Sequence, residues 1–184
     1  MRIAFMFLIC LAGVALQAEE MKVRVYGFSH PERVEDFHKA VSTLPELTLV
    51  NVDGDRASAT FRYDPPVLLG KAKPGPHEVT PEKILERINS LLGKASRQTF
   101  SVDAPSDLSE DKWVKVEIPV GVLDCKGCRY GAYIAIAKLE GVERASVNSD
   151  SLTLSVWIDP TKTNKEALEA ALKKARVELP GHQS

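Results

Sequence analysis

The chain has 184 residues, of which 44% are hydrophobic and 27% are charged, so its composition is that of one folded domain or two small ones. Its formal net charge is -1 at pH 7, which leaves no basic field to attract nucleic acid. We therefore expect a folded protein that does not bind nucleic acid.

The first 18 residues differ from the rest of the sequence. Met1-Arg2 is a short positive region, residues 3–16 form an apolar run without charge, and the small residue Ala18 follows. Such a run is shorter than the roughly 20 apolar residues that span a bilayer, and it has the pattern of a secretory signal. We predict a signal peptide over residues 1–18 and an exported mature protein, periplasmic or secreted.

The cysteine count changes with this cleavage. Cys10 leaves with the signal peptide, and the mature chain keeps only Cys125 and Cys128, which form one C-x-x-C motif. This count excludes a scaffold held by several disulfides.

A first set of elements is predicted over residues 22–102. Strands are expected at residues 22–26, 47–52, 57–63 and 98–102, with a hairpin turn at Asp53-Gly54. One helix follows from the apolar spacing of Val34, Phe37, Val41 and Leu44. A second helix is expected to begin with Thr80 as N-cap and Pro81 at its first position, and to stop at Gly93.

A second set of elements repeats this order after a polar linker at residues 103–111. Strands are expected at residues 114–120, 142–148, 152–158 and 176–179, with one helix beginning near Cys128. Thr163 and Glu166 have the spacing of a capping box that opens the last helix. The two sets align without a gap over much of their length, with Leu44 matching Leu139 and Val52 matching Val147.

The repeat defines the expected fold. Each copy has the order β-α-β-β-α-β, which predicts an α+β protein of two tandem ferredoxin-like domains, each with an antiparallel four-stranded sheet and two helices on one face. The first domain is expected at residues 22–102, with a loop insert at about 66–79, and the second at residues 113–180. Units this small are marginal alone, so they are candidates to pack together.

The C-x-x-C motif carries the chemistry of the sequence. Cys125 and Cys128 lie between a strand and the start of a helix, where backbone N–H groups and the helix dipole favour thiolate over thiol. Two thiolates without hard ligands suit Cu(I), Hg(II), Zn(II) or Cd(II), and softness favours the first two. A closed structural zinc site needs four ligands, so a shared or transferable ion is the better interpretation.

The second copy resembles the heavy-metal-associated (HMA) domain family, which includes copper chaperones, periplasmic mercury-binding proteins and modules of metal-transporting ATPases. The resemblance rests on the C-x-x-C at the start of the first helix, on the following Leu139-Glu140-Gly141-Val142 and on the order of elements. It implies that Cys125 and Cys128 are the metal ligands. Leu123 and Asp124 stand where the family has Met and Thr, and Ala175-Arg176-Val177 stands where it often has Ala-Gly-Tyr.

The first copy has the same shape without the cysteines. His30 falls at the position of the first cysteine and Arg33 at that of the second, so we interpret this copy as a degenerate HMA-like domain. His30 is expected to be a surface residue before Pro31, with auxiliary ligation as the alternative. His38 is expected on an exposed helix face, His77 in the insert and His182 in the tail.

Three functions are open from the sequence. The first is an exported protein that holds one soft ion, with Cu(I) first, for scavenging or for delivery to a metal-transporting membrane protein or another thiol metallochaperone. The second is a periplasmic thiol–disulfide redox protein, and the third is an interaction module with incidental cysteines. We find no Ser-His-Asp pattern, phosphate loop or His-Glu-x-x-His motif, so we do not expect an enzyme. The sequence does not determine the oligomeric state.

Overall fold

The computed structural model describes residues 18–71, 75, 79–121, 123, 125–148, 150 and 152–180. The predicted signal peptide, His77, Asp124 and His182 lie outside these residues, apart from Ala18. Among the described helices, none is long and apolar enough to cross a membrane.

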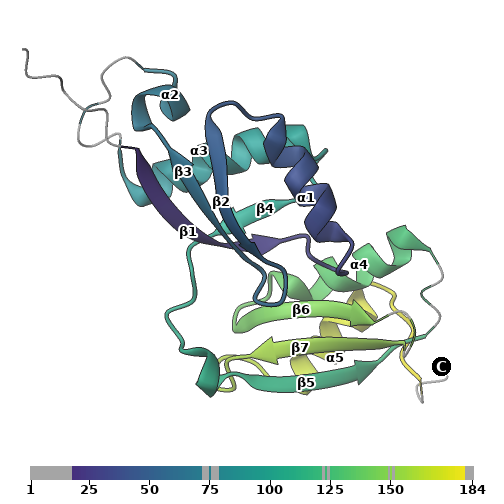
Figure 1. Ribbon diagram of the computed structural model, residues 1–184. Coiled ribbons are helices and arrows are strands. Elements are labelled where there is room, and N and C mark those ends of the chain that lie inside the picture. The colour runs from purple at the N-terminus through teal and green to yellow at the C-terminus, as the bar shows by residue number, and fades with distance from the viewer. Residues whose placement is uncertain are drawn as a thin grey trace, which may run out of the picture.

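The first unit comprises residues 19–103. Its elements are β1 (Glu19–Tyr26), α1 (Arg33–Ser42), β2 (Leu47–Asp53), β3 (Ser58–Tyr63), α2 (Pro65–Leu69), α3 (Pro81–Ala95) and β4 (Ser101–Asp103). The strands form one antiparallel sheet in the order β2-β3-β1-β4. This is the strand order of a ferredoxin-like β-α-β-β-α-β unit, and α1 and α3 cover its apolar face (Figure 1).

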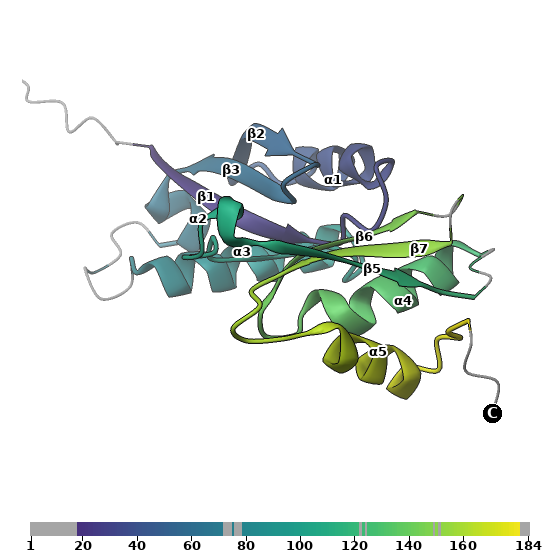
Figure 2. The ribbon, with the colours of Figure 1, turned by 90° about the horizontal axis from the view of Figure 1, so that it is seen from below.

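The second unit comprises residues 114–180. A 3-10 turn, η1 (Glu110–Lys112), leads into β5 (Val114–Pro119), which is followed by α4 (Lys126–Ala137), β6 (Val142–Asn148), β7 (Thr153–Ile158) and α5 (Lys165–Lys174). The strands pair antiparallel in the order β5-β7-β6. Figure 2 shows α4 and α5 on the same face of this sheet. The α+β class of antiparallel sheets and helices is therefore confirmed.

Each unit has its own apolar core. Phe28, Phe37 and Phe100 pack edge to face in the first unit, with ring centroids 5.1 to 6.0 Å apart. The second core has no phenylalanine; besides Tyr133 it is built from aliphatic side chains of the sheet and both helices, including Ile118, Ile136, Leu154, Leu168 and Leu172. The alternation of apolar residues along β7 places Leu154, Val156 and Ile158 inward.

Some local details differ from the sequence-based expectations. The start of the expected loop insert is helical, because Pro66–Leu69 belongs to α2, which ends at Gly70 in a left-handed conformation. Helix α3 does begin with the Thr80 cap, but it continues past Gly93 to Ala95.

Helix α5 begins one residue later than a cap at Thr163 would allow. The Asn164 side chain accepts from the N–H of Ala167 at 2.9 Å, whereas the N–H of Thr163 bonds to the carbonyl of Asp159. Thr163 thus belongs to the preceding turn, and the expected capping box is wrong.

The expected fourth strand of the second unit is also wrong. Within the described part of this unit, residues 176–179 join no sheet, and one backbone bond runs from the N–H of Gly121 to the carbonyl of Glu178 at 2.7 Å. Helix α5 ends in a Schellman motif, in which Val177 N–H bonds to Leu172 O and Arg176 has a φ of 60°. This turn ends α5, and the segment after it meets the chain that follows β5 at Gly121.

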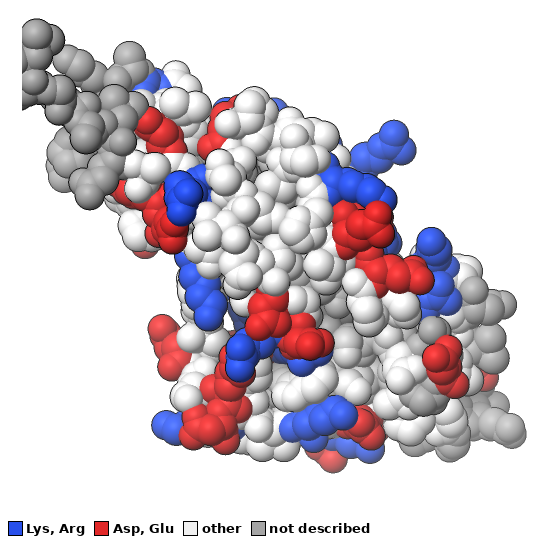
Figure 3. All heavy atoms as spheres, in the orientation of Figure 1, with Lys and Arg blue, Asp and Glu red and all other residues white. Residues whose placement is uncertain are grey.

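The two units contact each other through β6 and α4 of the second. Arg24 donates to the carbonyl of Val142 at 3.1 Å and forms a longer ion pair with Glu143 at 3.5 Å. Arg56 pairs with Glu110 of the linker at 3.1 Å. Figure 3 shows charged side chains of both signs gathered where the two units meet. The edge of β6 is therefore covered by the first unit.

Candidate metal centre

The segment that leads to the C-x-x-C motif is anchored at two points. The side chain of Leu123 is 7% exposed and belongs to the apolar core of the second unit. The carbonyl of Leu123 accepts a hydrogen bond of 3.0 Å from the Arg129 guanidinium, one helical turn into α4. Arg129 therefore ties this segment to the helix that carries the cysteines.

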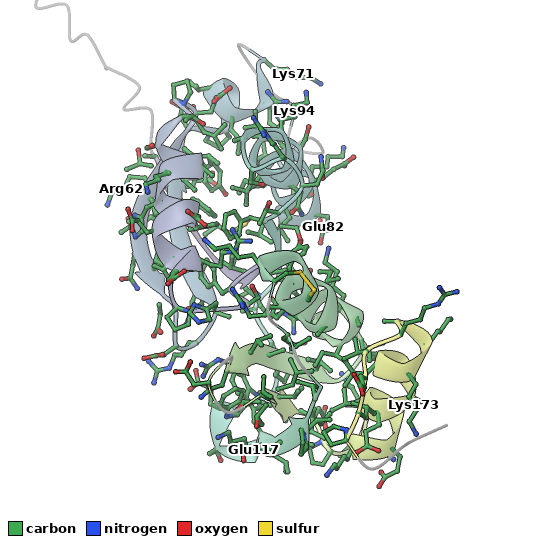
Figure 4. All side chains as sticks on the ribbon, turned by 90° about the vertical axis from the view of Figure 1, so that its right-hand side faces the viewer. Arg62, Lys71, Glu82, Lys94, Glu117 and Lys173 are labelled. Carbon is green, nitrogen blue, oxygen red and sulfur yellow. A yellow bond between two sulfur atoms is a disulfide. The ribbon has the colours of Figure 1, made fainter. Side chains whose placement is uncertain are left out.

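The two cysteines lie at the beginning of α4. Cys125 is the N-cap, with φ -106° and ψ 146°, and its Sγ accepts from the N–H of Cys128 at 2.9 Å. Their Cα atoms are 5.1 Å apart, and the two sulfurs are joined in a disulfide, drawn in yellow in Figure 4. Both residues are exposed to solvent. The sulfurs are thus adjacent, accessible and close to the free N–H groups of a helix end.

Helix α4 is held against the first unit by two tyrosines. Tyr133 is 2% exposed, and its hydroxyl accepts from the N–H of Gly27 at 2.9 Å. The Tyr130 hydroxyl donates to the carbonyl of Thr99 at 3.0 Å. Burial raises the pKa of Tyr133 to about 12. Both side chains lie within two turns of Cys128, so the cysteines belong to a helix that is fixed between the two units.

The corresponding loop of the first unit is used for packing. Gly27 has a φ of 112°, and a Cβ there would lie 2.4 Å from the Phe100 ring. Phe28 is buried, and the carbonyl of Ser29 accepts from the N–H of Val147 on β6 at 2.9 Å. The backbone groups of this loop therefore bind the second unit.

His30 and Arg33, which the sequence comparison of the two halves matched to Cys125 and Cys128, are not brought together as ligands. Arg33 is the first residue of α1 and pairs with Asp36 at 2.9 Å. A cavity of about 40 Å³ lies between this loop and α4; its lining comprises Ser29, His30, Glu32, Arg33, Asp36, Lys126 and Arg129. A space of this size holds about one water molecule.

Within the described part of the chain, no three His, Cys, Asp or Glu residues gather as a ligand set. His38 lies on the exposed face of α1, as its helical position predicts. Among the described residues, Cys125 and Cys128 therefore form a pair of possible ligands without a third such side chain beside them.

Sequence reasoning placed the cysteines at the start of the helix but missed the residues that fix this helix. Tyr130 and Tyr133 form a pair of rings with centroids 6.2 Å apart. Two tyrosines three positions apart on one helix are a visible signal, but the sequence does not say that they face another unit.

Comparisons with known proteins give little further information. No protein-family model and no curated protein matches the chain. The chain is similar to solved structures that include the water-soluble region of the P-type ATPase CopA from Bacillus subtilis and the N-terminal soluble domains of Bacillus subtilis CopA. Each is 22% identical with a TM-score of 0.34 and covers 91% of this chain, and the match spans 95% and 97% of the two neighbours.

Proposed function

We propose that the reduced protein binds one soft metal ion between the Sγ atoms of Cys125 and Cys128, for scavenging or for delivery to a partner. The observation that carries this proposal is the pair of sulfurs brought together at the exposed N-terminus of α4. Reduction of the disulfide would yield two thiols at a place where their deprotonated form is favoured.

The choice of metal follows from the ligands. Two thiolates satisfy a soft ion of low coordination number, so we propose Cu(I), with Hg(II) next. Zn(II) and Cd(II) remain alternatives whose further ligands would come from a partner or from solvent. The N–H of Cys128, which lies 2.9 Å from the Cys125 sulfur, would stabilise the negative charge of the thiolate pair.

The proposed mechanism of delivery is ligand exchange. Because both cysteines are exposed, thiolates of a partner can approach the ion and replace Cys125 and Cys128 one after the other. A metal-transporting membrane protein or another thiol metallochaperone fits this role. The chemistry requires binding and transfer, and no catalysed reaction.

A second candidate function is thiol–disulfide exchange, which the bonded state of Cys125 and Cys128 favours. An accessible disulfide at a helix N-terminus can be attacked by a thiolate of another protein, because the departing thiolate is stabilised there. A reduction potential close to that of catalytic dithiols would support this function. A much lower potential would leave metal binding as the better explanation.

The deciding experiment is a metal titration of the reduced chain from residue 19 onward. Native mass spectrometry would count bound Cu(I), Hg(II) and Zn(II), with Cys125→Ser/Cys128→Ser as the control. We expect one soft ion per chain, no ion in the double variant and none in the oxidised protein. Equal binding by the wild type and the double variant would refute the proposed site.

We also propose that the protein acts outside the cytoplasm, after removal of residues 1–18. Intact-mass measurement of the protein recovered from fractionated bacterial cells tests this directly. A mature chain that begins at Glu19 in the periplasm or medium is the expected result, whereas a full-length chain in the cytoplasm would contradict it.

A further inference from the structure

Strand β5 forms an edge of the second sheet. The order β5-β7-β6 leaves β5 and β6 at the two sides, and the first unit covers β6. Among the described residues β5 pairs with β7 alone, and residues 176–179 approach only its far end at Gly121. Figure 1 shows β5 along the lower margin of the molecule, with no strand beyond it. Open edges of this kind offer unpaired backbone groups to another strand.

The direction of each backbone group along β5 follows from two hydrogen bonds. The N–H of Val120 points to Leu152 on the β7 side, and the N–H of Gly121 points to Glu178 on the opposite side. Because successive residues alternate, Lys115 and Glu117 direct their N–H and C=O groups to the open edge. The edge is bounded by Pro119, which has no N–H, and by Trp113, whose N–H bonds to Glu110 O.

We propose that two copies of this chain associate by antiparallel pairing of β5 with β5, about a twofold axis at Val116. In this register Lys115 lies opposite Glu117 of the second copy, and Glu117 lies opposite Lys115 of the second copy. Each of these pairs exchanges two N–H···O bonds, because both residues carry their backbone groups at the open edge. The two symmetry-related pairs form one isologous contact.

Side-chain charge selects a second copy as the partner. Lys115 and Glu117 are on the same face of β5, where their side chains form an exposed ion pair of 2.6 Å. Antiparallel pairing sets each of them across from the opposite charge, and cross-strand pairs of opposite charge stabilise a sheet. Figure 3 shows both charge signs side by side along this lower margin.

An apolar contact accompanies the charged pairs. Val114 is 45% exposed although it lies on the core-facing side of the strand. The same register places it opposite Ile118 of the second copy, so the apolar layer continues from one sheet into the other. In the dimer, Ile118 of the second copy would cover Val114, which is exposed in the single chain.

The contact leaves the dithiol open. Figure 4 shows Glu117 on the side of the second unit that faces away from the first unit, apart from the disulfide. The segment after β5 leads to Cys125. Antiparallel pairing of the two β5 strands places the two copies of this segment at opposite ends of the dimer. The proposal therefore adds an interaction surface to the proposed function and does not depend on it.

Sedimentation equilibrium of the whole oxidised mature protein over a wide concentration range tests the dimer. Lys115→Glu and Glu117→Lys each place like charges opposite one another in both pairs, so each is expected to raise the dimer Kd at least about tenfold. The double variant Lys115→Glu/Glu117→Lys restores opposite charges in the same register and is expected to return the Kd close to that of the wild type.

Glu166→Lys is the matched control for Glu117→Lys. It makes the same change from a negative to a positive side chain, but at an exposed position in the first turn of α5 and not on β5. It is expected to leave the Kd unchanged, and circular dichroism of each variant checks its fold. A wild-type protein that stays monomeric at millimolar concentration would overturn the proposal. A folded double variant that associates no better than the single variants would also overturn it.

Discussion

The hydroxyl of Tyr133 on α4 accepts a hydrogen bond of 2.9 Å from the backbone N–H of Gly27, which lies 106 positions earlier in the chain. Both residues are buried. This bond joins the helix that begins at the two cysteines to the loop of the first unit that follows β1. The arrangement of the two units therefore depends on the same helix as the candidate metal site.

Tyr133→Phe is expected to lower the free energy of unfolding by about 1–3 kcal/mol, because it leaves the buried N–H of Gly27 without an acceptor. Urea denaturation of the oxidised protein measures the change. Tyr130→Phe is the control: its hydroxyl is partly exposed, so water can take over the bond to Thr99 and the loss should stay below about 0.5 kcal/mol. Equal losses in both variants would contradict this account.

Stability is expected to fall in alkaline solution. Burial raises the pKa of Tyr133 to about 12, above the ordinary tyrosine value of 10.0. The unfolded chain therefore releases this proton first as the pH rises. The stabilisation that Tyr133 contributes to the folded state is fully present below pH 10 and is lost between pH 10 and about 12. Denaturation midpoints of the oxidised protein over this range should decrease, and less steeply in Tyr133→Phe.

Gly27→Ala is expected to destabilise the protein by more than about 1 kcal/mol. Its φ of 112° is unfavourable for any residue with a Cβ, and the new atom would lie 2.4 Å from the Phe100 ring. Gly131→Ala is the opposite case, because Gly131 is within α4 and an added Cβ meets no atom within 4 Å. That change should raise stability by about 0.5–1 kcal/mol. Thermal unfolding of both variants compares them.

Arg129→Gln is expected to weaken the proposed binding of Cu(I) by roughly tenfold, the lower end of the loss seen when a group behind the metal ligands is removed. The variant loses the bond that holds the carbonyl of Leu123 next to the motif. Lys126→Gln removes a neighbouring charge but not this bond. Competition titrations with a Cu(I) chelator should show a clearly smaller effect in Lys126→Gln, and equal effects would mean that charge alone matters.

Arg176→Gly is expected to stabilise the protein by about 0.5–1 kcal/mol. Arg176 follows the end of α5 with a φ of 60°, which glycine adopts without strain. Calorimetry of the variant measures the increase in unfolding temperature. A decrease would mean that the Arg176 side chain has a stabilising role that exceeds the backbone strain.

Local signals in the sequence were sufficient for most of the secondary structure. Thr80 and Pro81 begin α3 as expected, because an N-cap hydroxyl and a proline at the first turn act on nearest neighbours. The position of Cys125 and Cys128 at the start of α4 follows from the same kind of local pattern.

The sequence-based predictions that were wrong have a common cause: the backbone groups involved form other hydrogen bonds, with neighbouring or with distant residues. Asn164, and not Thr163, caps α5, because its side chain accepts from the N–H of Ala167 and its carbonyl accepts from the N–H of Leu168. The strand expected at residues 176–179 does not form: the N–H groups of Arg176 and Val177 bond back to the end of α5, and Glu178 makes one backbone bond to Gly121. The bond between Tyr133 and Gly27 joins residues too far apart in sequence for periodicity to relate them.

The contact of Ser29 with Val147 has an evolutionary consequence. If the two units arose by duplication, the loop of the first has since become structural support for the second. Cysteines introduced at positions 30 and 33 would lie beside backbone groups already bound to β6 and α4. A second C-x-x-C motif in this loop would therefore need a simultaneous change in how the two units pack.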